Sequence, residues 1–430
     1  MRSLKARGRA GIQVSWGLVD QGFSSATNFG LTVIAGRLVG PKGLGVVYIG
    51  FSLYLFVLSF QRALVTDPLV VSSAPLDAPR REAAGRAALT LVLTGGLVAT
   101  TLMLLLSRVV PGPVGRGLLL FAPWMVLGLA QDFWRALLFR NGQGAAAALN
   151  DGVWVVSMVL VVPVAWWTRS EWAIVGTWGA GASIGGLLGF AQTRMRPVRP
   201  AIAWRWWREE ASTLGRWLGV ENAVLAAQAQ VLIIVLAAVL GARDLGGLRA
   251  VEAVFAPMTL VGEAMGLPGL PLLSQSLATS FASARRWAVR LSLITVGLVL
   301  TYLLIAGSVR TQVLSLVFGH SFDGFGNLVL PIGVAQLIFA GGSGFWLLAK
   351  AASRGRALVF ARALGSTTAL VAAVTLATVQ GLTGAAWGLA LGTGLGSGLI
   401  AVLTRRDVGT RRSGIPDVEP SEEGLTPARI

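Results

Sequence analysis

The chain has 430 residues, of which 54% are hydrophobic and 13% are charged, and its mean hydropathy is +0.70. A soluble protein of this length needs more charge to cover its surface, so the composition excludes that class. Apolar runs of about 20 residues recur along the sequence, which indicates a polytopic membrane protein. There is no cysteine and only one histidine, His320, so we expect no disulfide, no thiolate chemistry, no metal site and no cofactor.

The apolar runs predict an all-α fold of twelve transmembrane helices in two parallel six-helix halves. The first six lie at roughly 12–36, 44–66, 87–109, 116–139, 147–167 and 172–193. The second six lie at roughly 216–240, 246–273, 287–308, 326–349, 358–380 and 383–404. Six is an even number, so the second half enters the membrane in the same sense as the first and the halves are parallel.

The predicted helices divide the chain into five parts. We expect a basic cytoplasmic N-tail at 1–11, an N-terminal bundle at 12–193 and a C-terminal bundle at 216–404. An amphipathic cytoplasmic linker at 194–215 joins the bundles, and a disordered cytoplasmic tail follows at 405–430.

The net charge of +17 follows from where the cations lie. The two tails and the even-numbered connections hold 26 of the 36 Lys and Arg residues, whereas the odd-numbered connections hold 8. Cationic loops stay in the cytoplasm, so this distribution places both termini inside the cell. In the linker, five arginines are mixed with three tryptophans, a pattern that can bind nucleic acid. Its position between two membrane helices favours a segment lying on the inner leaflet instead, with no nucleic-acid partner.

A weak internal repeat relates the two halves at a register of 201 residues. The Gly-rich turn at 36–45 returns at 237–246, and positions 16–45 share 7 identities in 30 with their counterparts. The polar residues align as well, since Asp20 and Gln21 match Glu221 and Asn222. A repeat close to half the chain length indicates two equivalent bundles, with a substrate site between them near mid-depth.

The last predicted helix carries four glycines at a spacing of four, at positions 384, 388, 392 and 396. A dinucleotide-binding loop needs a strand before its glycines, and no strand is predicted here. The spacing therefore indicates a face of small residues that packs closely against another helix.

The residues that could carry chemistry are polar groups inside predicted helices. Each charge costs roughly 2.5–3.5 kcal/mol at mid-bilayer, so it needs a partner or a wet cavity. Guanidinium groups match phosphate geometry, so Arg62 and Arg135 are the candidates for a phosphate of the substrate. The candidate substrate-binding residues are Arg62, Arg135, Asn28, Gln21, Asn222 and Gln228. The candidates for a coupling ion or a charge partner are Asp20, Glu221, Asp132 and Glu263.

Two structural interpretations compete with these roles. Asp132 and Arg135 are three residues apart on one helix face and could neutralise each other as a local ion pair. Asp20 and Glu221 could form hydrogen bonds between helices without any part in transport. The functional alternative places these acids and arginines around one aqueous vestibule that opens to the cytoplasm.

The architecture and one loose motif resemble a known family. Twelve helices with both termini inside, and a Gly-Pro turn leading into an aromatic second helix (Gly40, Pro41, Gly45, Tyr48), are similar to the polysaccharide flippases of the multidrug/oligosaccharidyl-lipid/polysaccharide exporter superfamily. The resemblance implies a non-enzymatic bacterial inner-membrane flippase. Its substrate would be a polyprenyl-pyrophosphate-linked oligosaccharide, moved by alternating access. Coupling to H⁺ or Na⁺, and glycan-assembly proteins as partners, are left open.

Three other functions remain as alternatives. A cation-coupled multidrug exporter of the same superfamily would use Asp20 and Glu263 for the coupling ion. A membrane glycosyltransferase or polymerase needs a large external loop with acids, and the longest predicted here, 309–325, offers only Asp323 and His320. A membrane scaffold without transport activity is the third.

Overall fold

The computed structural model describes residues 2–72, 77–258, 269, 272–277, 279–352 and 354–405. Within these ranges all regular elements are helices, and eight of them are long and apolar enough to cross a membrane. The chain is therefore an all-α polytopic membrane protein. The elements are α1 (Arg2–Gln61), η1 (Arg62–Thr66), α2 (Asp67–Ser72), α3 (Ala78–Val109), α4 (Gly112–Phe121), η2 (Ala122–Trp124), α5 (Met125–Arg140), α6 (Gly144–Thr168), α7 (Glu171–Thr193), α8 (Pro200–Trp206), η3 (Trp207–Ala211), α9 (Ser212–Leu240), α10 (Ala242–Val254), α12 (Phe281–Ser308), α13 (Arg310–Phe318), η4 (His320–Leu328), α14 (Val329–Ala351) and α15 (Gly355–Arg405).

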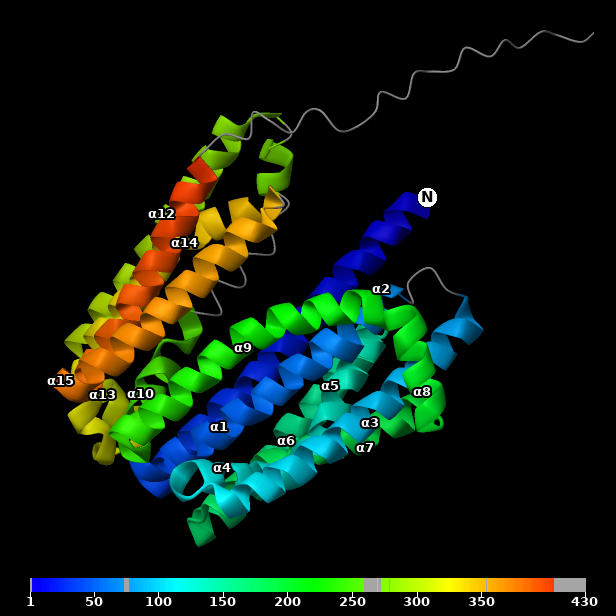
Figure 1. Ribbon diagram of the computed structural model, residues 1–430, viewed down its shortest axis with the longest axis horizontal. Helices are drawn as coiled ribbons and strands as arrows, with labels where there is room; N and C mark the ends of the chain where they lie inside the picture. The colour runs from blue at the N-terminus through cyan, green and yellow to red at the C-terminus, as the bar shows by residue number, and fades with distance from the viewer. Residues whose placement is uncertain are drawn as a thin grey trace, which may run out of the picture.

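Helix α1 is two helices joined at one residue. A straight helix of 60 residues would be about 90 Å long, three times the thickness of a hydrocarbon core. Gly40 breaks it with φ 66 and ψ −171, a conformation that other residues rarely adopt, and Pro41 follows directly. Residues 2–39 form a first arm and residues 41–61 a second arm that runs back beside it (Figure 1). The turn predicted at 36–45 is confirmed, although it is a single-residue break.

The same break occurs 201 residues later. Gly241, the sequence counterpart of Gly40, has φ 85 and ψ 169 and separates α9 from α10. The two glycines thus share one backbone conformation at equivalent places in the repeat.

Helix α15 is also two arms, joined at Gly381, where φ is 62 and ψ is −145. The glycines spaced by four lie where the arms meet: Gly388 faces Ala373, Gly392 faces Ala369, and Gly396 faces Gly365. At Gly365, a Cβ would lie 2.9 Å from the Gly396 Cα atom, so small residues are required for this approach. The predicted packing face is confirmed.

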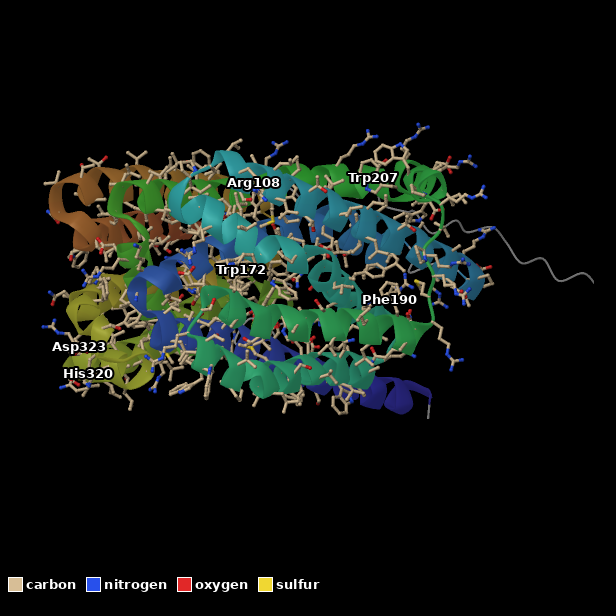
Figure 2. The ribbon with its side chains drawn as sticks, turned by 90° about the horizontal axis from the view of Figure 1, so that it is seen from below. Arg108, Trp172, Phe190, Trp207, His320 and Asp323 are labelled. Carbon is tan, nitrogen blue, oxygen red and sulfur yellow. The ribbon has the colours of Figure 1, made fainter. Side chains whose placement is uncertain are left out.

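The helices form two bundles that meet at one end and diverge at the other. Figure 1 shows α12, α14 and α15 on the left and α3, α5, α6 and α7 on the right, converging near α10, α13 and α4. In Figure 2, His320 and Asp323 of η4 lie at one end of the molecule, and Trp207 of η3 lies toward the other. We call the end with Gly40, Gly241 and η4 the turn end. We call the opposite end, where Arg80, Arg140 and Arg356 lie, the basic end.

Several predicted boundaries change. The region 309–325 was expected to be an external loop, but it holds the short helices α13 and η4. Helix α1 begins at Arg2, so the residues expected to form a tail are helical. The linker contains the helices α8 and η3, and α9 follows η3 without a break. The predicted disordered tail lies outside the described residues, apart from Arg405.

Candidate functional site

A cavity of about 670 Å³ lies between the first arm of α1, α10 and α14. These helices come from different halves of the sequence. Two of the predicted residues, Gln21 and Asn28, line this cavity. Further polar groups come from Ser25, Thr32 and Gln336, and apolar ones are contributed by residues such as Phe29 and Pro257. Hydroxyl and amide groups dominate its polar lining.

One ion pair lies in the cavity wall. Arg249 and Glu252, both on α10, approach to 3.5 Å between Nη1 and Oε2, and their side chains are 25% and 30% exposed. The hydroxyl of Tyr48 donates a 3.4 Å hydrogen bond to the Glu252 carboxylate, and the Arg249 guanidinium lies 5.0 Å from the centre of the Tyr48 ring. Arg249 is one of the eight cations counted in the odd-numbered connections, whereas the structure places it on α10 in the cavity wall. The pair neutralises itself, so the cavity carries both signs of charge but little net charge.

The cavity is closed toward the turn end by contacts between the halves. Gly45 of α1 lies against the carbonyl of Ala242, and Gly246 of α10 lies against the carbonyl of Pro41. Arg37 adds a polar link, because its guanidinium donates to the carbonyls of Leu316 and Val317 at the end of α13. No side chain separates the backbones of α1 and α10 at these glycines, so the two helices are in direct backbone contact.

Near the basic end, Arg62 pairs with Asp132. Arg62 donates from both Nε and Nη2 to the two carboxylate oxygens, with 2.9 Å between Nε and Oδ2. This bidentate pair joins η1 to α5, and the Arg62 side chain remains 45% exposed while that of Asp132 is 8% exposed. Two parallel hydrogen bonds between a guanidinium and a carboxylate hold both side chains in one orientation and also neutralise their charges.

Arg135 holds two acids from other helices. Its Nε lies 2.5 Å from Oδ2 of Asp20 on α1 and 3.8 Å from Oδ2 of Asp151 on α6. Its Nη2 donates to the Gln21 side chain at 3.2 Å, which connects this cluster to the cavity lining. Asp20 is 1% exposed, and its Oδ1 is buried without a hydrogen-bond partner.

These contacts correct one of the two structural interpretations. Asp132 and Arg135 do not pair with each other, since each binds a charge on another helix. Asp20 pairs with Arg135 on α5, and its predicted hydrogen bond to Glu221 stays a prediction because the Glu221 side chain lies outside the described part of the structure. The five charges of Arg62, Arg135, Asp20, Asp132 and Asp151 form one cluster, which we call the acid–arginine cluster. It contains three carboxylates and two guanidiniums.

A network of amides supports this cluster. Gln131 donates to Asp151 at 2.5 Å and to Asn150 at 3.3 Å. Asn150 in turn donates to the carbonyl of Gly185 at 2.9 Å and to Gln192 at 3.1 Å, so α5, α6 and α7 are joined through buried polar groups. Buried polar groups of this kind are stable only when their hydrogen bonds are made.

The remaining predicted residues lie on the other half. Glu221, Asn222 and Gln228 fall on α9, but their side chains lie outside the described part of the structure. Glu263 lies outside the described residues altogether. Gln230, two positions after Gln228, exchanges hydrogen bonds of 3.0 and 3.2 Å with Ser52 of α1 and so joins α9 to the second arm of α1.

Sequence reasoning missed Asp151, Asn150 and Gln336. Asp151 stands seven residues into an apolar helix, and the cost of a charge in such a position could have identified it. Asn150 and Gln336 carry no comparable signal, because single amides in apolar helices are common. Their roles follow only from which helices surround them.

Comparisons with known proteins give fold relatives only. No protein-family model matches the chain, and no curated protein matches it. Among solved structures, a multidrug resistance MATE family transporter of the MOP superfamily, in its inward-facing conformation, matches 90% of this chain and 97% of its own. The TM-score is 0.68 and the identity is 12%.

Two further structures show the same fold. The lipid II flippase MurJ in an inward closed conformation matches with a TM-score of 0.73 and 10% identity, over 91% of this chain and 88% of that chain. A MOP superfamily transporter from Pyrococcus furiosus, described as having a binding pocket of reverse polarity, matches with a TM-score of 0.57 and 11% identity, over 91% and 93% of the two chains. The chain therefore has the fold of these transporters.

Proposed function

We propose that this chain is a flippase that moves a polyprenyl-pyrophosphate-linked oligosaccharide across the bacterial inner membrane by alternating access. The cavity between the two halves carries this proposal. It offers amide and hydroxyl groups from Gln21, Ser25, Asn28, Thr32 and Gln336, which suit the hydroxyls of a glycan. A polar glycan cannot cross about 30 Å of hydrocarbon unaided, while its lipid tail can remain in the bilayer.

The arrangement of the halves supports a state that is open toward the basic end. Gly45 and Gly246 bring α1 and α10 into contact at the turn end, and the bundle of α12, α14 and α15 diverges from α3, α5, α6 and α7 toward the basic end (Figure 1). Helix α9 stays beside the first half, where Gly215 and Gly219 lie against Leu64. We take the basic end as cytoplasmic, with both termini inside. The eight apolar spans among the described residues become ten when the arms of α1 and α15 are counted separately, and taking α9 and α10 as further spans gives twelve. In this proposal the residues before 194 and after 215 are the two moving halves, joined by the cytoplasmic linker.

Arg62 and Arg135 are the proposed phosphate contacts. Both already bind carboxylates, so a pyrophosphate would exchange places with an acid rather than meet a free cation. Arg62 is the better placed of the two for such exchange, because its side chain is 45% exposed while that of Arg135 is 18% exposed. Arg135 does not line the cavity, but its hydrogen bond to Gln21 connects it to the cavity lining.

The acid–arginine cluster supports a second candidate, a cation-coupled exporter of multidrug type. With all groups ionised, three carboxylates and two guanidiniums leave one negative charge in excess. An excess charge within apolar helices is stabilised by uptake of a proton or a monovalent cation. The unpaired Oδ1 of Asp20 is the atom we propose for that uptake. Coupling by H⁺ or Na⁺ is compatible with the glycan substrate as well.

The test uses purified protein in proteoliposomes that contain a lipid-linked oligosaccharide. Transport is measured as the fraction of glycan that becomes accessible to a lectin on the opposite leaflet. We expect Asn28→Leu and Gln336→Leu to remove this activity while the folded yield stays unchanged, with Gly297→Ala, which has open space around it, as the matched control. Efflux of apolar cations by the wild type with no glycan translocation would favour the multidrug exporter instead.

A further inference from the structure

A second, smaller pocket lies away from the cavity, between α14 and the two arms of α15. Its volume is about 160 Å³, roughly a quarter of that of the cavity. All of its lining residues come from these three segments, which belong to the left-hand bundle of Figure 1. Gly365, Gly392 and Gly396, which bring the two arms of α15 together, also line the pocket. The pocket is therefore a groove along the line where the two arms meet.

The lining is charged and polar nearest the basic end and becomes mostly apolar further in, although Thr393 lies close to the level of Ala369. Trp346, Arg362 and Ser397 lie five to eight residues from the basic ends of their helices, which is about 7–12 Å at 1.5 Å per residue. Phe339 and Ala369 lie seven residues further along, about 10 Å deeper. The polar end thus faces the headgroup level of one leaflet, and the apolar end faces its acyl chains.

Arg362 supplies a positive charge at the polar end of the pocket. The Arg362 guanidinium lies 5.3 Å from the centre of the Trp346 ring, and among the described residues it forms no ion pair. The hydroxyls of Ser366 and Ser397 line the same pocket, and the indole N–H of Trp346 is buried without a hydrogen-bond partner. The site offers donors and a positive charge, and its described lining includes no carboxylate.

The apolar end is exposed to its surroundings. Phe339, which lines the deeper end of the pocket, is 45% exposed. In a membrane protein, large apolar side chains exposed on outer helices face lipid. The pocket is therefore continuous with the acyl region of the bilayer.

We propose that this pocket binds one anionic glycerophospholipid of the leaflet at the basic end. Its phosphate is held by Arg362 and the hydroxyls of Ser366 and Ser397, and the start of one acyl chain lies along Phe339. Basic pockets between transmembrane helices on the cytoplasmic side are suited to such headgroups. The identification of this leaflet as the cytoplasmic one rests on the proposed function, because it depends on the proposed membrane orientation. The pocket itself does not depend on it. The bound lipid would tie the arms of α15 to α14 and so stabilise this bundle.

The experiment measures lipid binding to the full-length chain in detergent after delipidation. Short-chain phosphatidylglycerol is titrated against phosphatidylcholine of the same chain length, and thermal unfolding and native mass spectrometry report stabilisation and retained lipid. We expect phosphatidylglycerol to raise the unfolding temperature more, and Arg362→Gln to weaken its apparent affinity about tenfold, because charge-assisted hydrogen bonds are lost. Arg362→Lys keeps part of the effect.

Two matched variants keep the result interpretable. Arg356→Gln removes an exposed cation from the same end of α15 outside the pocket and should bind like the wild type. Ser366→Leu fills the pocket without changing the charge and should lose binding. Equal losses in Arg356→Gln and Arg362→Gln, or full binding by Ser366→Leu, would overturn the site. Because the assay involves no transport, its failure is distinguishable from failure of the proposed function.

Discussion

Gly45 and Gly246 occupy equivalent positions in the two halves, 201 residues apart, and each lies against the backbone of the opposite half. A Cβ on Gly45 would fall on the carbonyl of Ala242, and one on Gly246 would fall on the carbonyl of Pro41 and 2.8 Å from the Gly45 nitrogen. Since Ala242 is the counterpart of Pro41, the contact is reciprocal and follows the symmetry of the repeat. The turn end is closed by backbone contact, so a larger residue at either glycine must separate the halves there.

The first prediction concerns this contact. Gly45→Val and Gly246→Val should open the turn end, because the added atoms cannot be accommodated without moving the opposite helix. The chain has no native cysteine, so Ser25→Cys in the cavity gives a clean label. We expect a membrane-impermeant maleimide added at the turn-end side to label it several-fold faster in the valine variants. Gly297→Val, on α12 with open space around it, is the control.

The second prediction concerns the burial of Asp20. Arg135→Met leaves the carboxylates of Asp20 and Asp151 without their cation, and breaking a buried pair in this way costs roughly 3–5 kcal/mol. We expect a large drop in the free energy of unfolding, measured by thermal or denaturant unfolding in detergent. Adding Asp20→Leu to the same chain should restore part of the loss. A single variant as stable as the wild type would contradict the pairing.

The third prediction separates the roles of Arg62 and its partner. Arg62 is half exposed but Asp132 is 8% exposed, so Arg62→Gln leaves a buried carboxylate without its partner and should cost roughly 1–3 kcal/mol of stability. If Arg62 binds pyrophosphate, this variant should lose most translocation of the lipid-linked glycan, whereas Asp132→Asn should retain the guanidinium and its substrate contact. The lectin-accessibility assay in proteoliposomes measures both. Unchanged activity in Arg62→Gln and in Arg135→Lys would remove these arginines from the site.

The fourth prediction tests the orientation in the membrane. The turn between α6 and α7 lies at the turn end, and the turn between α5 and α6 lies at the basic end. Single cysteines at Thr168 and Gln143 should therefore be labelled from outside and inside the cell, respectively. Labelling of Thr168→Cys only after permeabilisation would reverse the orientation and with it the direction assigned to the cavity.

The fifth prediction concerns coupling. Asp20→Asn removes one of the three carboxylates and leaves the acid–arginine cluster neutral, so the cluster no longer needs an added cation. We expect translocation by this variant to become insensitive to an imposed H⁺ or Na⁺ gradient. The wild type should respond to one of the two gradients. A variant that keeps the full gradient dependence would place coupling elsewhere.

The sequence by itself determined the class of the protein and the places where its chain reverses. Hydropathy is read along the chain, so the apolar runs predicted an all-helical membrane protein without reference to any contact. The turns at 36–45 and 237–246 were recognisable as Gly-rich segments between apolar runs, and the small-residue face at 384–396 because a spacing of four lies on one side of a helix.

Only the tertiary structure decided which charges meet. From spacing alone, Asp132 had a partner three residues away in Arg135, yet it binds Arg62, 70 residues distant, and Arg135 binds Asp20, 115 residues distant. The choice depends on how each helix is rotated about its axis and on which helix lies opposite. Neither property is present in a local pattern. For the same reason Arg249 and Gln336 entered the cavity, and Asp151 joined the cluster, only once the helices were packed.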